Sequence, residues 1–325
     1  MRTEREEIKT VIRSFAKINL SIDVGQAGSD GYHSVDMIMQ QLAFHDDVEL
    51  RFRPGKPEGS GETGFSLNLT TTRVYLPTDR RNLAFRAAEL VAGRYGIEGA
   101  IDIHLVKRIP VAAGLAGGSG NAAAVIHGLN VLAGLDLGLE EILELCAELG
   151  SDIPFCAAGQ ARGNKNLPSA VRQDAMAVSC MRARGRGTEM TPVWGIRTPI
   201  VFAKPPLSVS TAEAYRGYDQ CTVTRRPDND QLERDLNAAR GGGVRNGFRK
   251  QRRNFINVLE AYTLQAYPEV RELKERMKGL GAAYALMSGS GPTVFGIFGN
   301  IRDAQNASQA LREEGLEAYW TRTMM

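Results

Sequence analysis

Apolar and polar positions follow two periods along the chain, one typical of strands and one of helices. Ile101, Ile103 and Leu105 alternate with polar side chains, which predicts a strand, whereas residues 122–129 carry apolar side chains at helical spacing, which predicts a helix ending near 132. Further strands are predicted at 10–24, 47–53, 65–69, 199–203 and 294–298. Further helices are predicted at 82–95, 139–149, 229–239, 250–265, 268–279 and 302–314. The mixture of both elements indicates an α/β or α+β first half.

A glycine-rich run connects the strand near 105 with the helix that follows it. The run extends from Pro110 to Asn121 and contains four glycines and a serine. Backbone N–H groups at a helix N-terminus have no partner within the helix, and the helix dipole favours an anion there. Glycine allows the backbone to approach that anion closely. The run is therefore predicted to bind phosphate, with a ligand-free glycine turn as the alternative.

Common nucleotide-binding fingerprints do not explain this run. The sequence has no Gly-Lys-Ser/Thr string at the spacing of a Walker loop, and its GxGxxG string at 59–64 leads into a predicted strand rather than a helix. A second glycine-serine turn, at 287–293, directly precedes the strand predicted at 294–298. The two turns together favour a phosphate site of another kind.

The composition is that of an ordinary globular protein. The chain has 325 residues, of which 43% are hydrophobic and 24% charged, and this length is sufficient for two domains. Its net charge of +3 is too small to indicate a nucleic-acid partner, and the basic residues between 245 and 253 are interpreted as a solvated helix face. The sequence has no apolar run of about 18 residues and no apolar segment after its charged start, so we expect neither a membrane span nor a signal peptide.

The four cysteines indicate a reducing compartment. Cys146, Cys156, Cys180 and Cys221 are separated by 10, 24 and 41 positions, which match neither a metal-binding pair nor a disulfide framework. We therefore expect free thiols in a cytoplasmic protein.

Six strings, in their order along the chain, resemble motifs of the GHMP small-molecule kinases. One is the Pro-x-x-x-Gly-Leu-x-Gly-Gly-Ser string that begins at Pro110. The other five are Ala16–Leu20, Asp30–His33, Gly150–Phe155, Val209–Tyr215 and Asn257–Glu260. The resemblance implies the α+β class, with a ribosomal-protein-S5-domain-2-like N-terminal domain at 1–163 and a ferredoxin-like C-terminal domain at 164–325. It also implies ATP-dependent phosphorylation of a small alcohol.

The resemblance places the ATP site at the glycine-rich run. The residues that it assigns to ATP there are Pro110, Val111, Ala112, Ala113, Gly114, Leu115, Ala116, Gly117, Gly118, Ser119 and Gly120. Ser119 is expected to reach a phosphate or Mg²⁺, and Asn82 and Lys107 to border the adenine. The turn of Gly289, Ser290 and Gly291 is expected to brace the site. Phosphoryl transfer requires Mg²⁺, whose protein ligands are not assigned because it often relies on water and substrate phosphates.

Two charged residues are candidates for the chemistry. Asp152 precedes Pro154 at a spacing that favours a helix N-cap, whereas the resemblance implies the base that takes the proton of the acceptor hydroxyl. Lys17 lies in an apolar strand, where a buried lysine requires a partner. The resemblance implies that Lys17 lies beside Asp152, keeps its carboxylate ionised and faces the γ-phosphate. An exposed lysine on an edge strand is the alternative.

Tyr32 and His33 follow a glycine in a turn, and the resemblance assigns them to a cytidyl substrate. His33 is expected to hydrogen-bond the edge of a cytosine ring, and Tyr32 or Tyr215 to stack on it. From the residues alone, a histidine in a turn is more often only solvated. Asn19 is expected to hydrogen-bond the substrate, and Thr211 with Tyr215 to close the pocket. Three further histidines are interpreted as structural: His45, His104 and His127.

These assignments predict a kinase that phosphorylates a cytidyl sugar alcohol on the non-mevalonate route to isoprenoid precursors. A homoserine or mevalonate type of kinase is the alternative within enzymes, against which the Gly-Tyr-His string at 31–33 argues. A non-catalytic nucleotide-binding sensor is the alternative outside enzymes, against which Lys17 and Asp152 weigh. No nucleic-acid or membrane partner is expected, and the oligomeric state is left open.

Two segments depart from the family's pattern. The turn at 184–189 comes late in the sequence, so the polar residues 160–186, which lack periodicity, are expected to contain an inserted loop of about twenty residues. Residues 238–253 are basic and glycine-rich and do not read as a compact helical stretch.

Overall fold

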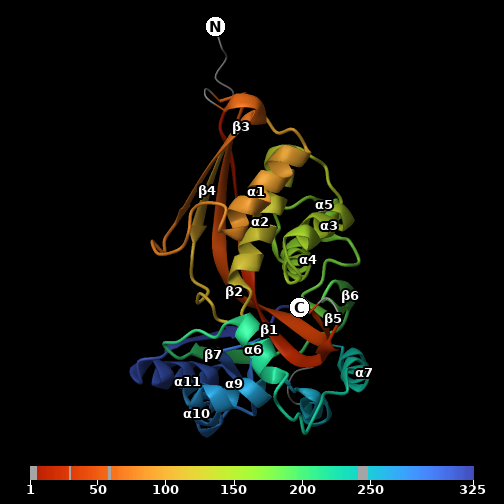
Figure 1. Ribbon diagram of the computed structural model, residues 1–325, viewed down its shortest axis with the longest axis vertical. Coiled ribbons are helices and arrows are strands. Elements are labelled where there is room, and N and C mark those ends of the chain that lie inside the picture. The colour runs from red at the N-terminus through yellow and green to blue at the C-terminus, as the bar shows by residue number, and fades with distance from the viewer. Residues whose placement is uncertain (1–5, 29–30, 58–59, 241–247) are drawn as a thin grey trace. The chain divides into compact units, whose positions relative to one another are not determined.

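The computed structural model describes residues 6–28, 31–57, 60–240 and 248–325, which form two compact units (Figure 1). The first unit contains residues up to Ala16 together with His45–Ile109 and Ala116–Val178, and the second contains Lys17–Phe44, Pro110–Leu115 and Ser179–Met325. The units are discontinuous in sequence because strands β1 (Ile8–Ala27) and β2 (His33–Pro54) contribute residues to both. The domain boundary at 163/164 stays a prediction.

The sheet of the first unit is centred on β4 (Gly99–Val106). The second half of β2 pairs with β4 in antiparallel fashion, so that Leu50 lies opposite Ile103. Strand β3 (Phe65–Thr71), which follows the short helix η1 (Gly61–Thr63), pairs with β4 in parallel. Every second residue of β4 is buried, and this confirms the strand predicted from the alternating pattern.

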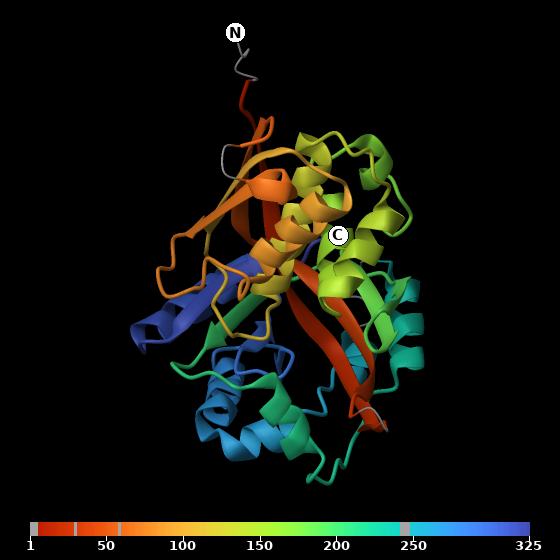
Figure 2. The same cartoon turned by 45° about the horizontal axis from the view of Figure 1, so that its top comes forward.

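Helices pack against this sheet through small side chains. The helices of the first unit are α1 (Leu83–Arg94), α2 (Gly117–Leu132), α3 (Leu139–Leu149), α4 (Ile153–Gly163) and α5 (Ser169–Arg172). Helices α1 and α2 lie side by side in both views (Figures 1 and 2). A Cβ on Gly128 would lie 2.6 Å from Cδ1 of Leu50, so the backbone of α2 touches the sheet directly. Helix α4 begins directly after Asp152, where the spacing of Asp152 and Pro154 predicts a helix start, although its residues 153–161 are buried on all sides and have no polar face.

His127 is a buried titratable group between α2 and α4. Its Nε2–H donates to the carbonyl oxygen of Ala157 at 2.9 Å, and its Nδ1 has no partner among the described residues. Burial lowers the pKa of the imidazole from 6.5 to about 4. As the pH falls from 6.5 toward 4, the unfolded chain binds a proton that the folded protein does not bind, and the stability present above pH 6.5 is lost.

Acidification from pH 7 to pH 5 is therefore expected to lower the free energy of unfolding by about 2 kcal/mol through His127. Urea unfolding at the two pH values measures this loss. The control is His127→Gln, which retains an N–H donor for Ala157 but does not titrate, and it should lose about 2 kcal/mol less than the wild type. Equal losses in the two proteins would exclude a contribution from His127.

Residues 160–186 contain short helices and a strand joined by turns rather than one continuous loop. They include the end of α4, α5 and β5 (Cys180–Gly185), and Leu167 and Val171 belong to the core of the first unit. Asn164 uses its side-chain amide to bond both backbone groups of Arg13, at 2.8 and 3.0 Å, as a neighbouring strand would. Helix α5 and strand β5 were not predicted because isolated apolar anchors and a side-chain amide leave no periodic signal in the sequence, and the insertion relative to the family stays a prediction.

The second unit contains an antiparallel sheet in the order β10-β7-β9-β8. These strands are β7 (Pro199–Lys204), β8 (Tyr284–Met287), β9 (Val294–Ile297) and β10 (Glu317–Arg322). Helices α10 (Pro268–Gly279) and α11 (Ile301–Glu313) pack on this sheet (Figure 1). Helices packed on an antiparallel sheet agree with the ferredoxin-like arrangement that was expected.

A buried arginine links the other elements of the second unit. Strand β5 pairs with the first half of β2 and with β6 (Glu189–Pro192), and α7 (Asn229–Ala239) follows α6 (Thr211–Tyr218). The Arg182 guanidinium contacts Asp36 at 2.6 Å, Asp230 at 2.6 Å and Glu233 at 2.8 Å. Its hydrogen bonds with Asp36 are the largest cause of a pKa raised above the usual arginine value. Arg182 therefore joins β5 to β2 and α7 as a permanent cation.

The single helix predicted at 250–265 is wrong. The structure has α8 (Phe248–Gln251), η2 (Arg252–Asn254) and α9 (Glu260–Ala266) in its place. Asn257 interrupts them, because its side chain accepts from the N–H of Leu259 and donates to the carbonyl oxygens of Met287 and Gly289. These hydrogen bonds to a distant turn stabilise a break in the helix that the local sequence pattern alone does not predict. The basic segment 238–253 lies partly outside the described residues.

Candidate active site

The glycine-rich run leads from β4 into α2, as the sequence predicts. Residues Pro110–Leu115 belong to the second unit, and the run continues in the first unit from Ala116. Ala112 and Ala116 have φ values of 51° and 56°, in the left-handed region. An L-residue there costs about 1 kcal/mol or more, and strain of this kind is concentrated at functional loops. The run is therefore held in a conformation that its local sequence does not favour.

The first turn of α2 presents backbone N–H groups beside open space. The N-cap residue, Ala116, has no side-chain cap. A Cβ on Gly118 would meet no atom within 4 Å, whereas a Cβ on Gly120 would lie 2.5 Å from Oγ of Ser14. Gly120 is thus required for packing against β1, and Gly118 faces outward. The turn offers an open and positively polarised backbone to an anion.

Gly118→Val is expected to weaken ATP binding about tenfold or more, because its side chain would occupy the space through which a phosphate approaches the backbone. Calorimetric titration with ATP measures this change. Gly93→Val in α1 is the matched control, since a Cβ on Gly93 also meets nothing within 4 Å. Unchanged ATP affinity in Gly118→Val would place the phosphate elsewhere.

Asp46 ties the residues before the run to α2. Its fully buried carboxylate accepts the backbone N–H groups of Arg108 at 2.6 Å and Ile109 at 2.8 Å, and the side-chain amide of Asn121 at 3.0 Å. It also forms an ion pair with Lys107, whose ammonium group donates to Oδ1 of Asn121 at 2.8 Å. A buried charge pair requires such additional hydrogen bonds. Lys107 therefore has an internal role, and its adenine contact stays a prediction.

Asn82 is the N-cap of α1. Its Oδ1 accepts the N–H of Ala84 at 3.0 Å, and its Nδ2 donates to the carbonyl oxygen of Pro77 at 2.8 Å. A cap of this type contributes about 1 kcal/mol to a helix. Its contact with adenine also stays a prediction.

Asp152 lies at the start of α4 in the first unit. It occupies the N-cap position and is half-buried, but its side chain makes no capping hydrogen bond. Pro154 lies in the first turn, where a missing N–H leaves no bond unmade. The N-cap position favoured by the spacing is therefore confirmed, a capping bond from the Asp152 side chain is absent, and the role of a base stays a prediction.

Lys17 lies in the part of β1 that belongs to the second unit. Its side chain is buried, with Nζ donating to Oδ1 of Asn19 at 2.8 Å. Its backbone N–H donates to the carbonyl oxygen of Leu115 at 3.1 Å, which fixes β1 beside the glycine-rich run. The alternative of an exposed lysine on an edge strand is wrong. Asn19 is also buried, and its amide contacts Sδ of Met37 at 3.4 Å.

The second glycine-serine turn packs against the run within the second unit. The hydroxyl of Ser288 donates to the carbonyl oxygen of Gly114 at 2.9 Å. Gly114 has φ +69°, and a Cβ there would lie only 2.2 Å from the carbonyl oxygen of Ser288. Asn257 holds the turn through two carbonyl oxygens, those of Met287 at 3.0 Å and Gly289 at 2.7 Å. The turn that was expected to brace the site therefore lies against the run.

Two of the predicted substrate residues meet in an aromatic cluster. The ring of His33 lies 5.2 Å from that of Tyr215 and 6.4 Å from that of Tyr218. Nε2 of His33 lies 2.7 Å from Oδ1 of Asp219. The hydroxyl of Tyr218 donates to the carbonyl oxygen of Val24 at 2.6 Å, which attaches α6 to β1. The imidazole is therefore held between aromatic rings and a carboxylate.

Tyr32 and Thr211, two other predicted substrate residues, make contacts of their own. Tyr32 is 63% exposed, and the Arg186 guanidinium lies 4.7 Å from the centre of its ring. Thr211 begins α6, and its hydroxyl lies 3.2 Å from that of Ser290. Tyr32 thus offers an exposed aromatic face, and Thr211 connects α6 to the second turn.

The sequence analysis did not identify three residues that hold parts of the candidate site in place: Asp46, Asp219 and Ser288. Asp46 and Asp219 stand in no motif, and their partners are distant in sequence, at Lys107 and His33. Ser288 lies in the glycine-serine turn that was recognised, so its position was available from the sequence, but its contact with Gly114 was not. Each of these contributions arises from tertiary contact alone.

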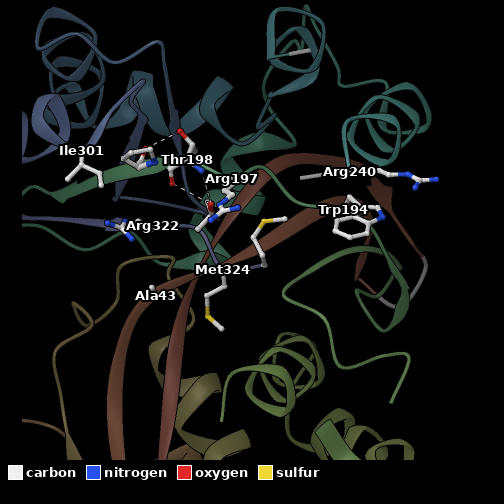
Figure 3. Close-up of a pocket in the computed structure, with 11 residues that line it drawn as sticks. Ala43, Trp194, Arg197, Thr198, Arg240, Ile301, Arg322 and Met324 are labelled. Carbon is white, nitrogen blue, oxygen red and sulfur yellow. Dashed lines mark hydrogen bonds between the residues drawn. The ribbon is translucent and has the colours of Figure 1, made fainter. Parts of the chain in front are cut away.

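The second unit has a cavity of about 850 Å³ that none of these residues lines. Its lining includes Trp194 and the arginines 197, 240 and 322, and it contains none of the predicted site residues. In Figure 3, Arg322 and Arg240 lie at opposite sides of the view, with Arg197 between them. The guanidinium groups do not gather around one point, so the geometry assigns no ligand to this cavity.

The structure also describes the cysteines, the groups of side chains that could hold a metal ion, and the length of the helices. All four cysteines have free thiols, as expected. Within the described ranges, His, Cys, Asp and Glu side chains form no group of three or more that could hold a metal ion. None of the helices described has the length and apolar character needed to cross a membrane.

The sequence matches two models of one family. Residues 82–160 match the GHMP kinases N terminal domain, and residues 232–316 match the GHMP kinases C terminal domain. The 4-diphosphocytidyl-2-C-methyl-D-erythritol kinase of Alkaliphilus metalliredigens (strain QYMF) is 40% identical over 301 residues, which cover 92% of this chain and 91% of that protein.

Solved structures agree with this result. A crystal structure of 4-(cytidine 5'-diphospho)-2C-methyl-D-erythritol kinase superposes with a TM-score of 0.75 at 27% identity, covering 97% of this chain and 100% of that one. A homoserine kinase from Cytophaga hutchinsonii ATCC 33406 shares the fold, with a TM-score of 0.66 at 17% identity over 100% of this chain and 96% of that one. The chain belongs to the GHMP kinase family.

Proposed function

We propose that the protein transfers the γ-phosphoryl group of ATP to the 2-hydroxyl of 4-diphosphocytidyl-2-C-methyl-D-erythritol, giving the 2-phosphate and ADP. The observation that carries the proposal is the His33 cluster, which offers a fixed hydrogen-bonding imidazole beside aromatic rings in a chain of the kinase family. Similarity to kinases of this substrate over most of the chain supports it. We also infer a cytoplasmic location.

ATP fits the first turn of α2. The uncapped backbone at Gly118 supplies N–H donors to phosphate oxygens, and the absence of a Cβ leaves room for them. Ser119, in the same turn, is the residue whose hydroxyl would hold a phosphate or Mg²⁺. Mg²⁺, when bound with ATP, supplies charge neutralisation at the phosphates. The contacts of Asp46 keep residues 107–109 in place next to this helix.

The chemical step requires a proton acceptor and a cation. The acceptor oxygen forms its bond to the γ-phosphorus as the bond from that phosphorus to the bridging oxygen of ADP breaks. Asp152 takes the hydroxyl proton as general base. Lys17, held by Asn19, supplies positive charge for the γ-phosphate. Positioning by these residues accounts for most of the catalysis expected in a phosphoryl transfer.

A coupled ADP-release assay tests the proposal. Purified protein with Mg²⁺-ATP is offered 4-diphosphocytidyl-2-C-methyl-D-erythritol, homoserine or mevalonate in parallel. The proposal predicts rapid turnover of the cytidyl substrate alone. Turnover of homoserine or mevalonate instead would support kinase activity but contradict the assignment of the cytidyl substrate. ATP binding without turnover of any acceptor would favour a nucleotide-binding sensor.

A further inference from the structure

His33 is held by contacts on several sides within the second unit. Its side chain is only 8% exposed, and its Nε2 lies 2.7 Å from Oδ1 of Asp219. The ring packs against Tyr215 and Tyr218, and the Tyr218 hydroxyl is itself fixed by Val24 and by Arg226 at 3.0 Å. The imidazole therefore has little freedom to rotate.

The carboxylate of Asp219 also determines which ring nitrogen carries the proton. An ionised carboxylate only accepts hydrogen bonds, so Nε2 of His33 must donate. In the neutral ring this leaves a lone pair on Nδ1. Nδ1 makes no hydrogen bond with a described residue. His33 thus presents a hydrogen-bond acceptor at a fixed place.

We propose that Asp219 is a positioning residue that holds Nδ1 of His33 as an acceptor for the 4-amino group of cytosine and thereby discriminates against uracil. This inference rests on the proposed function. Cytosine offers an N–H donor at C4, whereas uracil offers a carbonyl oxygen at the same place. Two acceptors would then face each other, and a buried unmatched pair of this kind is strongly disfavoured.

The carboxylate of Asp219 is not needed to form α6. Asp219 follows the helix, and its backbone N–H bonds the carbonyl oxygen of Tyr215 at 3.1 Å whatever its side chain. The helix is attached elsewhere by Glu213, which accepts the hydroxyl groups of Tyr262 at 3.1 Å and Tyr267 at 2.6 Å. An isosteric change at Asp219 therefore acts on His33 and leaves the helix in place.

The tautomer can be tested without turnover. ¹⁵N spectra of protein labelled in its four histidines, with His33 assigned by comparison with His33→Gln, should show that the neutral His33 ring has its proton on Nε2 and none on Nδ1. A proton on Nδ1 of the neutral ring would overturn the inference, whatever the activity of the protein.

Selectivity supplies the second test. Kinetics are measured with the cytidyl substrate and its uridyl counterpart. In Asp219→Asn, whose amide can donate to Nε2 and reverse the tautomer, the preference for cytidyl should fall at least about tenfold, mainly through a higher KM for the cytidyl substrate. The kcat and the KM for ATP should change less than about twofold. Asp219→Glu should recover part of the preference, and Asp136→Asn, at an exposed position, should retain all of it.

The outcomes separate this inference from the proposed function. Wild-type turnover that prefers cytidyl, with the same preference in Asp219→Asn, would overturn the role of Asp219 and leave the proposed function intact. Equal loss of kcat for both substrates and of ATP affinity would assign Asp219 a structural role and overturn the inference. Absence of wild-type turnover with the cytidyl substrate would overturn both.

Discussion

Asp152→Asn should lower kcat by at least about 100-fold, the usual scale for a positioned acid or base, and leave the affinity for ATP unchanged within about twofold. The amide has nearly the same size as the carboxylate but cannot take the proton of the acceptor hydroxyl. The start of α4 should be unaffected because the side chain of Asp152 makes no capping hydrogen bond. Steady-state kinetics and calorimetric ATP titration measure the two quantities.

Asp136→Asn provides the control for Asp152→Asn, since it makes the same chemical change at an exposed position. It should retain the wild-type kcat. A near-normal rate in Asp152→Asn would remove Asp152 from the role of base. Loss of ATP binding together with rate would instead indicate damage to the first unit.

Gly114→Ala should lower the free energy of unfolding by about 2 to 4 kcal/mol. Its φ of +69° disfavours any side chain, and the new Cβ would lie 2.2 Å from the carbonyl oxygen of Ser288. That oxygen cannot withdraw easily because Asn257 holds the neighbouring carbonyl groups of the turn. Urea unfolding measures the change.

The matched control for Gly114→Ala is Gly118→Ala in the same run. A Cβ on Gly118 meets nothing within 4 Å, and its φ is not in the left-handed region. This variant should be as stable as the wild type or slightly more stable, because alanine favours the helix. If Gly114→Ala were equally stable, the two turns would not be held together as the structure describes.

Elements with a regular surface period could be predicted from the sequence. β4, α1 and α3 each have one buried and one more exposed face, so the period of their apolar residues reports their structure. Helix α2 is buried on all sides at 120–130 and was predicted from the spacing of its apolar residues and the glycine-rich run before it. The glycine-rich run was also predictable, because strand and helix patterns on either side place it at a helix N-terminus. The resemblance of this run to a kinase motif then predicted the family to which the chain belongs.

Elements determined by tertiary contact could not be predicted. Asn257 breaks a helical pattern to bond a distant turn, and the Arg182 network stabilises β5 in a stretch without periodicity. The same limit applied to the candidate site. The sequence indicated His33 and Lys17, but not Asp219, which orients His33, or Asp46, which pairs with Lys107.

The most direct measurement of the central claim is ³¹P NMR of the reaction of the wild-type protein with Mg²⁺-ATP and 4-diphosphocytidyl-2-C-methyl-D-erythritol. The account predicts one new phosphomonoester signal, coupled to the carbon that bears the 2-hydroxyl and equal in amount to the ADP formed. ADP formed with free phosphate alone, or a phosphoryl group on another hydroxyl, would contradict it.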